Sequence, residues 1–334
     1  MMDGKCHVIG IIMANNSRNK NSMYNKIKRN NSFNLNFVGI NFKLSIPNNI
    51  EQIVFKDYLN YLPPFKITEE KSEVNIYVYR DKPSLVVDGE NIFLSNESSP
   101  EQFSRDIILL ISKFLEQKLN KKDIFSLHAS AVSSSNMGIA MVGPNGSGKT
   151  TSAIYSCLVN KNIKFVSGNR LFIDGINIVS GTRGIRLRAG SLKSEFKLDN
   201  YILPDILEFQ DKKVSVIAED LGINANLNYP IRLIKIILVK KLEKELTVKK
   251  LDMSNNAQLN EAFLILHNSA SEFNDNFPNF VLGSKIPYPN MFTDEHRRKR
   301  IVFVSNLLRN VESIKVEGRL EEIGEYISRS IRKK

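Results

Sequence analysis

Hydrophobic and polar residues alternate along the first third of the chain, and this alternation predicts strands and hairpins. FNLNFVGINFKLSI, beginning at Phe33, predicts a strand or a hairpin. SLVVDGENIFLS, with its Asp88-Gly89 turn, predicts a hairpin, and EVNIYVYRD predicts a strand. Apolar residues at helical spacing predict helices in NIEQIVFKDYLNYL and in SSPEQFSRDIILLISKFLEQKL, with Ser98 or Ser99 as a cap. We therefore expect residues 33–122 to form a small α+β domain.

After residue 122 apolar strands alternate with helical patterns, which is typical of an α/β fold. IFSLHASAVSS and MGIAMVG each predict a strand, and KTTSAIYSCLVNK predicts the helix that follows them. KVSVIAED and PIRLIKIILVKKL predict further strands, and the last part of the chain predicts a helix, a short strand and a closing helix. We expect residues 123–334 to form a sheet with flanking helices, and residues 1–32, rich in Asn, Lys and Ser, to be poorly ordered.

Composition narrows the class of protein further. The 334 residues are 42% hydrophobic and 25% charged, as in a globular protein, and no apolar run reaches membrane-spanning length. Only two cysteines are present, Cys6 and Cys157, which argues against a disulfide framework and for a cytoplasmic location. The net charge of +12 suggests nucleic acid, but the basic residues are spread along the chain. The densest run, HRRKR, precedes an apolar run, which favours a solvated helix face over a nucleic-acid site.

The segment GIAMVGPNGSGKTTSAIYSCL contains the pattern G-x-x-x-x-G-K-[ST], between an apolar strand and a helix. Glycines allow backbone N–H groups to point at phosphate oxygens, and the start of the helix adds positive charge. Lys149 is expected to reach the β- and γ-phosphates, and the Thr150 hydroxyl is expected to ligate Mg²⁺. The predicted nucleotide-binding residues are Gly143, Pro144, Asn145, Gly146, Ser147, Gly148, Lys149, Thr150 and Thr151. The loop contacts the phosphates and not the base, so it does not distinguish ATP from GTP.

A second acidic element completes many nucleotide sites, because a carboxylate at the end of a strand holds the metal. VSVIAED, which ends in Glu219-Asp220, is the candidate, and an ordinary strand running into a polar turn is an equal alternative. IKIILVKK is a better core strand, but it ends in lysines and supplies no metal ligand. The chain has no LSGGQ motif, which argues against ABC proteins, and its one N-K-x-D match, Asn120–Asp123, lies before the loop.

The order of LHASAV, a Ser-rich turn, an apolar strand and GPNGSGKTT resembles the kinase domain of HPr kinase/phosphorylase and its relatives. It is more distantly similar to ATP-type phosphoenolpyruvate carboxykinase. SGTRGIRLR and VESIKVEGRLEEIGEYISRSI also resemble segments of these kinases, so that the resemblance covers about residues 124–330. It implies that residues 123–334 form an HPr-kinase-like domain with the mixed sheet of a P-loop kinase-like fold.

One element departs from the family. The family carries two aspartates at the end of the strand after the loop helix, and FVSGNR has Gly168 and Asn169 there. An amide ligates Mg²⁺ weakly and cannot accept a proton as a general base. Asp220, Glu219 or, least favoured, Asp174 at a hairpin tip could replace the missing acids. Phosphoryl transfer could also proceed by positioning alone, or the nucleotide could bind without turnover.

Two further groups have both a functional and a structural interpretation. The resemblance places His128 near the phosphates, and the alternative is a core histidine beneath the loop. Arg183, Arg186 and Arg188 alternate as on one strand face, which could grip phosphate or an acidic substrate, or could be solvated. The predicted catalytic residues are thus His128, Lys149, Asn169 and Asp220, with Thr150 and Glu219 for metal and Arg183 and Arg188 for substrate.

These observations predict an ATP-dependent phosphotransferase that moves the γ-phosphate to a hydroxyl of a peptide, small protein or metabolite. A nucleotide-binding sensor or scaffold without turnover is the alternative, and an ATPase coupled to peptide modification or transport is a third. The expected cofactors are ATP, or GTP, and Mg²⁺. The expected partners are the nucleotide and the acceptor, with no membrane span, no nucleic acid, and a homo-oligomer left open.

Overall fold

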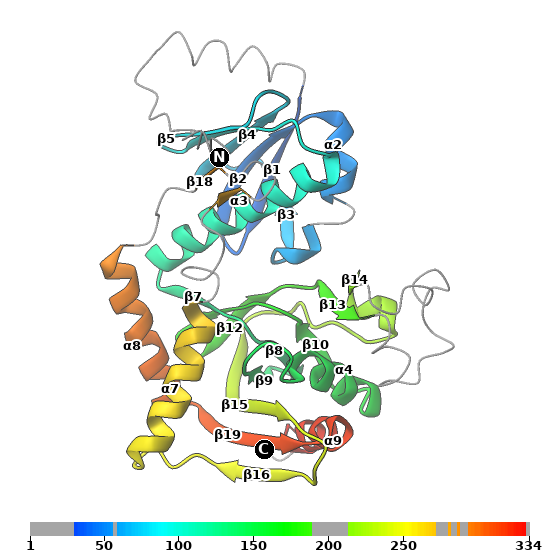
Figure 1. Ribbon diagram of the computed structural model, residues 1–334, viewed down its shortest axis with the longest axis vertical. Helices are drawn as coiled ribbons and strands as arrows, with labels where there is room; N and C mark the ends of the chain where they lie inside the picture. The colour runs from blue at the N-terminus through cyan, green and yellow to red at the C-terminus, as the bar shows by residue number, and fades with distance from the viewer. Residues whose placement is uncertain are drawn as a thin grey trace, which may run out of the picture. The chain divides into compact units, whose positions relative to one another are not determined.

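A computed structural model of the chain describes residues 30–55, 59–188, 213–271, 280–281, 286–287 and 293–331 (Figure 1). Most of the segment 1–32 therefore lies outside the described residues. The chain divides into two compact units, which we treat separately. The first comprises Met1–Leu59, Phe65–Lys118 and Phe277–Met291, and the second comprises Asn60–Pro64, Leu119–Asn276 and Phe292–Lys334.

The first unit is a mixed six-stranded sheet with the order β3-β1-β2-β4-β6-β5. The hairpin predicted at Asp88-Gly89 is confirmed, since β5 pairs antiparallel with β6, and of the two alternatives for the first segment the hairpin is present, since β1 pairs antiparallel with β2. Left-handed backbone at Gly39 and Gly89 closes these tight turns. The strands are β1 (Asn31–Phe37), β2 (Ile40–Ile46), β3 (Phe65–Ile67), β4 (Val74–Tyr79), β5 (Ser84–Asp88) and β6 (Asn91–Ser95).

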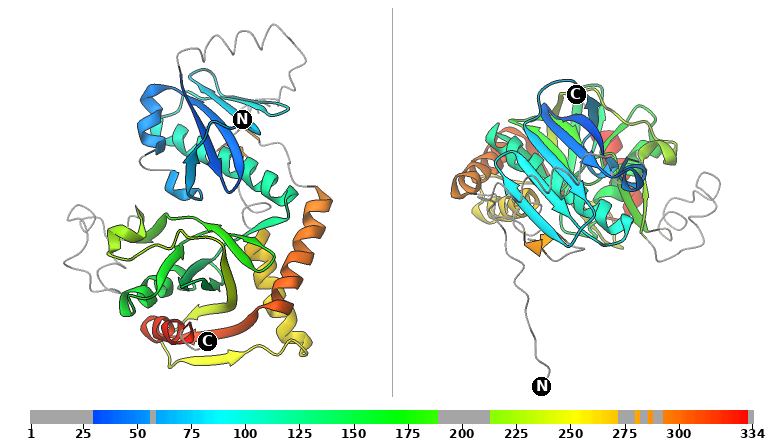
Figure 2. Two further views of the ribbon diagram at one scale, coloured as in Figure 1. Left: turned by 180° about the vertical axis from the view of Figure 1, so that it is seen from behind. Right: turned by 90° about the horizontal axis from the view of Figure 1, so that it is seen from above.

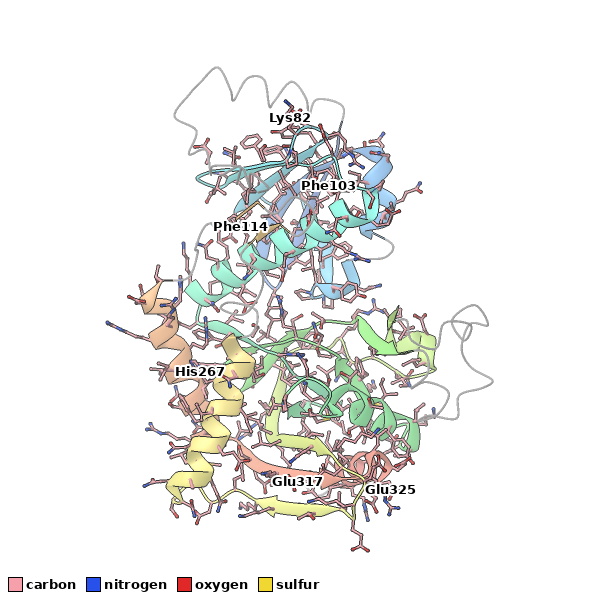
Figure 3. The ribbon with its side chains drawn as sticks, viewed as in Figure 1. Lys82, Phe103, Phe114, His267, Glu317 and Glu325 are labelled. Carbon is pink, nitrogen blue, oxygen red and sulfur yellow. The ribbon has the colours of Figure 1, made fainter. Side chains whose placement is uncertain are left out.

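Helix α3 (Pro100–Lys121) is the long helix of this unit and begins where the sequence predicts. The Ser99 hydroxyl accepts a hydrogen bond from the Gln102 N–H at 3.3 Å, which caps the helix. Phe103 and Phe114, labelled in Figure 3, are buried side chains of its apolar face. Within the predicted first helix the described residues contain α2 (Asn48–Ile53) and a 3₁₀ turn, η2 (Leu59–Tyr61), and residues 56–58 lie outside them. A short pair, β17 (Phe280–Val281) and β18 (Ile286–Pro287), groups with this unit.

The second unit contains a mixed nine-stranded sheet. Its main path is β10-β8-β9-β15-β12-β11-β7, and β19 pairs with β15 and β16. β15 runs parallel to β9 and to β19, whereas the other pairs are antiparallel. The strands are β7 (Ile124–Leu127), β8 (Ser130–Ser134), β9 (Met137–Val142), β10 (Lys164–Ser167), β11 (Leu171–Asp174), β12 (Asn177–Gly181), β15 (Ile231–Lys241), β16 (Thr247–Lys250) and β19 (Glu312–Gly318).

Helices cover both faces of this sheet. α4 (Lys149–Val159) and α9 (Leu320–Ser330) bury their apolar residues with Ile139, Met141 and Ile237. α7 (Asn256–Ser271) and α8 (Asp294–Asn310) form the opposite core with Ala140 and Val142. Figure 2 shows from behind the yellow α7 and orange α8 together on one side of the unit. The described chain is thus mixed α/β, with mixed sheets and six α-helices. None of these described helices is both long and apolar enough to span a membrane.

The prediction of one continuous strand for IFSLHASAVSS is wrong. β7 and β8 lie at distant places in the strand order, although only His128 and Ala129 separate them in the sequence. A two-residue connection spans little distance, so the sheet must curl until these strand ends approach each other. The strand breaks there because the backbone N–H groups bond elsewhere: His128 donates to the Ser269 carbonyl at 3.0 Å, and Ala129 to the Asn169 carbonyl at 3.2 Å.

Candidate functional site

The predicted phosphate loop joins the end of β9 to the start of α4. Gly143, Gly146 and Gly148 have φ values of 151°, 81° and 94°, which residues other than glycine rarely adopt. A Cβ on Gly143 would lie 2.8 Å from both the Ser147 Oγ and the Val239 carbonyl oxygen. The loop conformation therefore depends on glycine, for both backbone freedom and space.

Two polar side chains of the loop are turned into the protein. Lys149 is only 6% exposed, and its Nζ donates to the Gly143 and Pro144 carbonyls at 2.8 and 3.1 Å. The Ser147 hydroxyl is buried and makes no hydrogen bond with any described residue. A buried hydroxyl without a partner costs about 1–3 kcal/mol. A bound phosphate oxygen would accept a hydrogen bond from the Ser147 hydroxyl. The site therefore fits a phosphate group through its glycine loop, the start of α4, Lys149 and Ser147.

Thr150, the expected metal ligand, belongs to a small hydroxyl network. Its Oγ1 donates to the Gly168 carbonyl at 2.9 Å and lies 2.9 Å from the Ser130 Oγ. The Ser130 hydroxyl also donates to the Gly168 carbonyl, at 3.0 Å, and Ser130 is fully buried. Ser130 was missed as a site residue, although it is the serine of the LHASAV segment. The network ties the start of α4 to β8 and to the end of β10.

Gly168 and Asn169 occupy the corner between β10 and β11. A Cβ on Gly168 would lie 3.1 Å from the Ile185 Cγ1, 3.2 Å from the Gly184 carbonyl oxygen and 3.3 Å from the Phe165 Cζ. Asn169 is half-buried, and its carbonyl oxygen accepts the bond from the Ala129 N–H. The two corners, at 128–129 and 168–169, therefore lie side by side. Gly168 also contacts Thr150, so the corner where the resemblance expects the acids does adjoin the loop.

His128 lies at the first of these corners. Its backbone N–H donates to the Ser269 carbonyl, and its carbonyl accepts from the Ser269 hydroxyl at 2.9 Å, so α7 holds it in place. Ser130 faces Met141 in the register of β8 and β9, which puts His128 at the loop end of the sheet. Its catalytic role remains a prediction. The other described histidines have local contacts instead: His267, labelled in Figure 3, stacks on Phe263 at 5.8 Å, and His296 bonds to Thr293 at the start of α8.

The acidic pair Glu219-Asp220 lies outside the main sheet. Among the described strands β14 (Lys213–Val216) pairs with β13 (Ile185–Arg188) alone, and both carboxylates belong to exposed residues of the 3₁₀ turn η3 (Ala218–Leu221). Glu219 Oε1 forms a 2.7 Å ion pair with Arg183, and Asp220 Oδ2 accepts the Ile217 N–H at 2.9 Å. Each carboxylate thus has a structural partner. Among the described residues no group of three or more His, Cys, Asp and Glu side chains could hold a metal ion.

The prediction that Arg183 shares one strand face with Arg186 and Arg188 is wrong, because Arg183 precedes β13 and lies an odd number of residues from both. Arg183 does adjoin the corner at Gly168. It follows Thr182, whose carbonyl accepts the Gly168 N–H at 3.3 Å, and its guanidinium reaches Glu219. The side chains of Arg186 and Arg188 fall outside the described residues, so only the backbone of β13 places them. Asp174 ends β11 as an exposed residue before the left-handed Gly175, which is the geometry of a turn.

Tyr229 is a neighbour of this region that the sequence did not indicate. Burial raises the pKa of its hydroxyl to about 12, and the Gly181 backbone and the charge of Arg183 lower it in part. The hydroxyl is buried without a hydrogen bond of normal geometry to a described residue. Gly181 in turn packs on β10, since a Cβ there would lie 2.7 Å from the Val166 carbonyl oxygen.

No protein-family model matches the chain, and a search of the curated proteins returns no match. The class of site is therefore defined by its own geometry. It is a glycine loop at a helix start, with a buried lysine and serine turned inward and a threonine hydroxyl fixed by Ser130 and Gly168.

Proposed function

We propose that this chain binds a nucleoside triphosphate at Gly143–Thr151 and acts as an HPr-kinase-like phosphotransferase toward a hydroxyl acceptor. The observation that carries the proposal is the phosphate cradle. Three left-handed glycines open it, and the buried Ser147 hydroxyl is a donor without an acceptor among the residues that the structure describes. The proposal includes the finer fold, a P-loop kinase-like sheet preceded by a small α+β domain.

The chain's residues would share the work as follows. The loop N–H groups and the start of α4 hold the phosphates. Lys149 would leave the Gly143 and Pro144 carbonyls and neutralise the β- and γ-phosphates, and Thr150 is the residue that would hold Mg²⁺. His128 and Asn169, which lie on neighbouring corners, would bond the transferred group, and Arg183 would bind an anionic part of the acceptor. Bound Mg²⁺ would supply charge neutralisation between the β- and γ-phosphates.

No carboxylate occupies the position where the family has its base. Gly168 contributes only a carbonyl, and the amide of Asn169 cannot take a proton. Transfer would then depend on positioning and on charge neutralisation, which supply most of the catalysis in phosphoryl transfer. The proton of the acceptor hydroxyl would leave to solvent as the new P–O bond forms and ADP departs. We expect slow turnover compared with a kinase that has both aspartates.

The same corner favours a second candidate function, a nucleotide-binding sensor or scaffold without turnover. The specific observation is the crowding at Gly168, where an added Cβ would lie 3.2 Å from the Gly184 carbonyl oxygen and 3.3 Å from the Phe165 Cζ. An aspartate there would require the neighbours to shift. The corner thus has little room for the first of the two aspartates that the family uses in transfer, which favours binding without transfer.

One set of measurements separates these functions. Calorimetric titration of the full chain with ATP and Mg²⁺ tests binding, and Lys149→Ala should reduce the affinity by at least about tenfold. Lys164→Ala, which removes an exposed lysine at the start of β10, is the matched control and should bind normally. Incubation with γ-labelled ATP and Ser/Thr peptides then tests transfer. Binding without transfer or hydrolysis supports the sensor, and ATP binding that survives Lys149→Ala refutes both functions.

A further inference from the structure

The strand beside the loop strand ends in two lysines rather than in an acid. β15 pairs parallel with β9 up to Leu238 and Val142, so the residues after Leu238 run alongside the loop. The Lys241 N–H donates to the Ser147 carbonyl at 2.9 Å. A Cβ on Gly148 would lie 3.2 Å from the Lys241 Cβ. Lys241 is therefore in direct contact with the loop at the glycine that precedes Lys149.

Strand alternation fixes which of the two lysines faces the site. Ile237 and Val239 pack in the core beneath α4 and α9, and Ile236 and Leu238 pack in the core of the opposite face. Successive side chains of a strand point to opposite faces. Lys241 therefore projects on the face where α4 begins, and the exposed Lys240 projects away from it.

The hydroxyl network gives the direction of a bound triphosphate. The threonine of such a loop ligates the metal that bridges the β- and γ-phosphates, so Thr150 marks the γ end. Thr150 contacts Ser130 of β8 and Gly168 at the end of β10, and both strands lie on one side of β9. β15 lies on the other side of β9. The α-phosphate, at the opposite end of the chain of phosphates, would then lie on the side of Lys241.

We infer that Lys241 is a further nucleotide-binding residue, whose ammonium group binds the α-phosphate. This inference rests on the proposed function. A lysine is a flexible, strongly charged donor, and its four-carbon stem starts here beside the first residues of α4. Lys241 therefore adds a second positive charge to the one that Lys149 supplies at the β- and γ-phosphates. Because Thr150 contacts the Ser130 hydroxyl and the Gly168 carbonyl, which carry no charge, this second lysine would increase the share of phosphate charge that the protein itself neutralises.

The test uses the full chain and two ligands, ATP and inorganic tripolyphosphate. Lys241→Met keeps the stem that packs on Gly148 and removes the charge, and it should weaken both ligands by about tenfold. Lys241→Arg should restore most of the affinity. Lys240→Met removes the same charge from the opposite face and is the matched control, expected to bind within about twofold of wild type. Thermal unfolding checks that each variant is folded.

The outcomes distinguish this inference from the proposed function. Unchanged ATP affinity in Lys241→Met overturns the inference, provided that Lys149→Ala still weakens binding. A loss for ATP but not for tripolyphosphate also overturns it, because the contact would then be with the nucleoside. An equal loss in Lys240→Met shows a general charge effect and refutes a specific contact. If wild type fails to bind ATP, or Lys149→Ala binds it normally, the proposed function fails and the inference fails with it.

Discussion

Replacing Gly168 tests whether the corner beside the loop is closed to side chains. Alanine there would place a Cβ 3.1 Å from the Ile185 Cγ1 and 3.2 Å from the Gly184 carbonyl oxygen, closer than ordinary van der Waals contact. Overpacking of this kind costs about 1–3 kcal/mol. Replacing glycine restricts the unfolded chain and returns about 0.4–1 kcal/mol. The expected net result for Gly168→Ala is a loss of roughly 1 kcal/mol in the free energy of unfolding.

Gly168→Asp should cost more than Gly168→Ala, because it adds a carboxylate that points among the same neighbours and faces the Gly184 carbonyl oxygen. Asn169→Asp is the matched control, since Asn169 is half-buried and keeps its size on substitution. It should change the free energy of unfolding by less than about 0.5 kcal/mol. Urea unfolding followed by circular dichroism measures all three variants. A neutral or stabilising Gly168→Ala would refute the reasoning, because the neighbours would then have room to give way.

Three further predictions concern packing and ionisation elsewhere in the second unit. Gly324→Ala should cost about 1–3 kcal/mol, because its Cβ would lie 2.5 Å from the Tyr155 Cδ1 where α9 packs on α4, and thermal unfolding measures this. Cys157, with a pKa of about 12, should resist a thiol reagent at pH 8 in a Cys6→Ser background until urea unfolds the chain; rapid labelling of folded protein would contradict this. The raised pKa of Tyr229 contributes stability below about pH 10 that is lost as the pH rises toward 12, and Tyr229→Phe should abolish this dependence in alkaline unfolding curves.

Local patterns predicted the local structure well. The β5–β6 hairpin follows from Asp88-Gly89 and alternating residues, and α3 begins at Pro100 behind its Ser99 cap. The strand–loop–helix unit around Lys149 follows in the same way, because the glycine pattern leaves few other conformations. Each of these features is specified by residues that are neighbours in the sequence.

What the sequence did not reveal depends on pairing between distant segments. LHASAV contains no Gly, Pro, Asn or Asp, yet the strand breaks at His128 because its backbone bonds to Ser269, 141 residues away. VSVIAED has the periodicity of a core strand, but its partner is β13 rather than β9, which removes Asp220 from the sheet. Lysine is not a metal ligand, so the sequence did not indicate a role for Lys241 at the site. Only the parallel register of β15 with β9 puts it against the loop.

The Gly168 carbonyl separates two tasks that a carboxylate would combine at this position. An acid beside Thr150 would accept the hydroxyl proton, which orients the oxygen lone pairs, and would also supply negative charge and a base. Here the Gly168 carbonyl accepts the hydrogen bond from the Thr150 hydroxyl at 2.9 Å, which keeps that hydroxyl oriented. The Ser130 hydroxyl donates to the same carbonyl oxygen. Thr150 can present its oxygen to a metal without giving up this bond, because ligation uses a lone pair and not the proton. Under the proposed function the site lacks the negative charge of a carboxylate, so we expect weak metal binding relative to phosphate binding, and Lys149 and Lys241 would neutralise the phosphates.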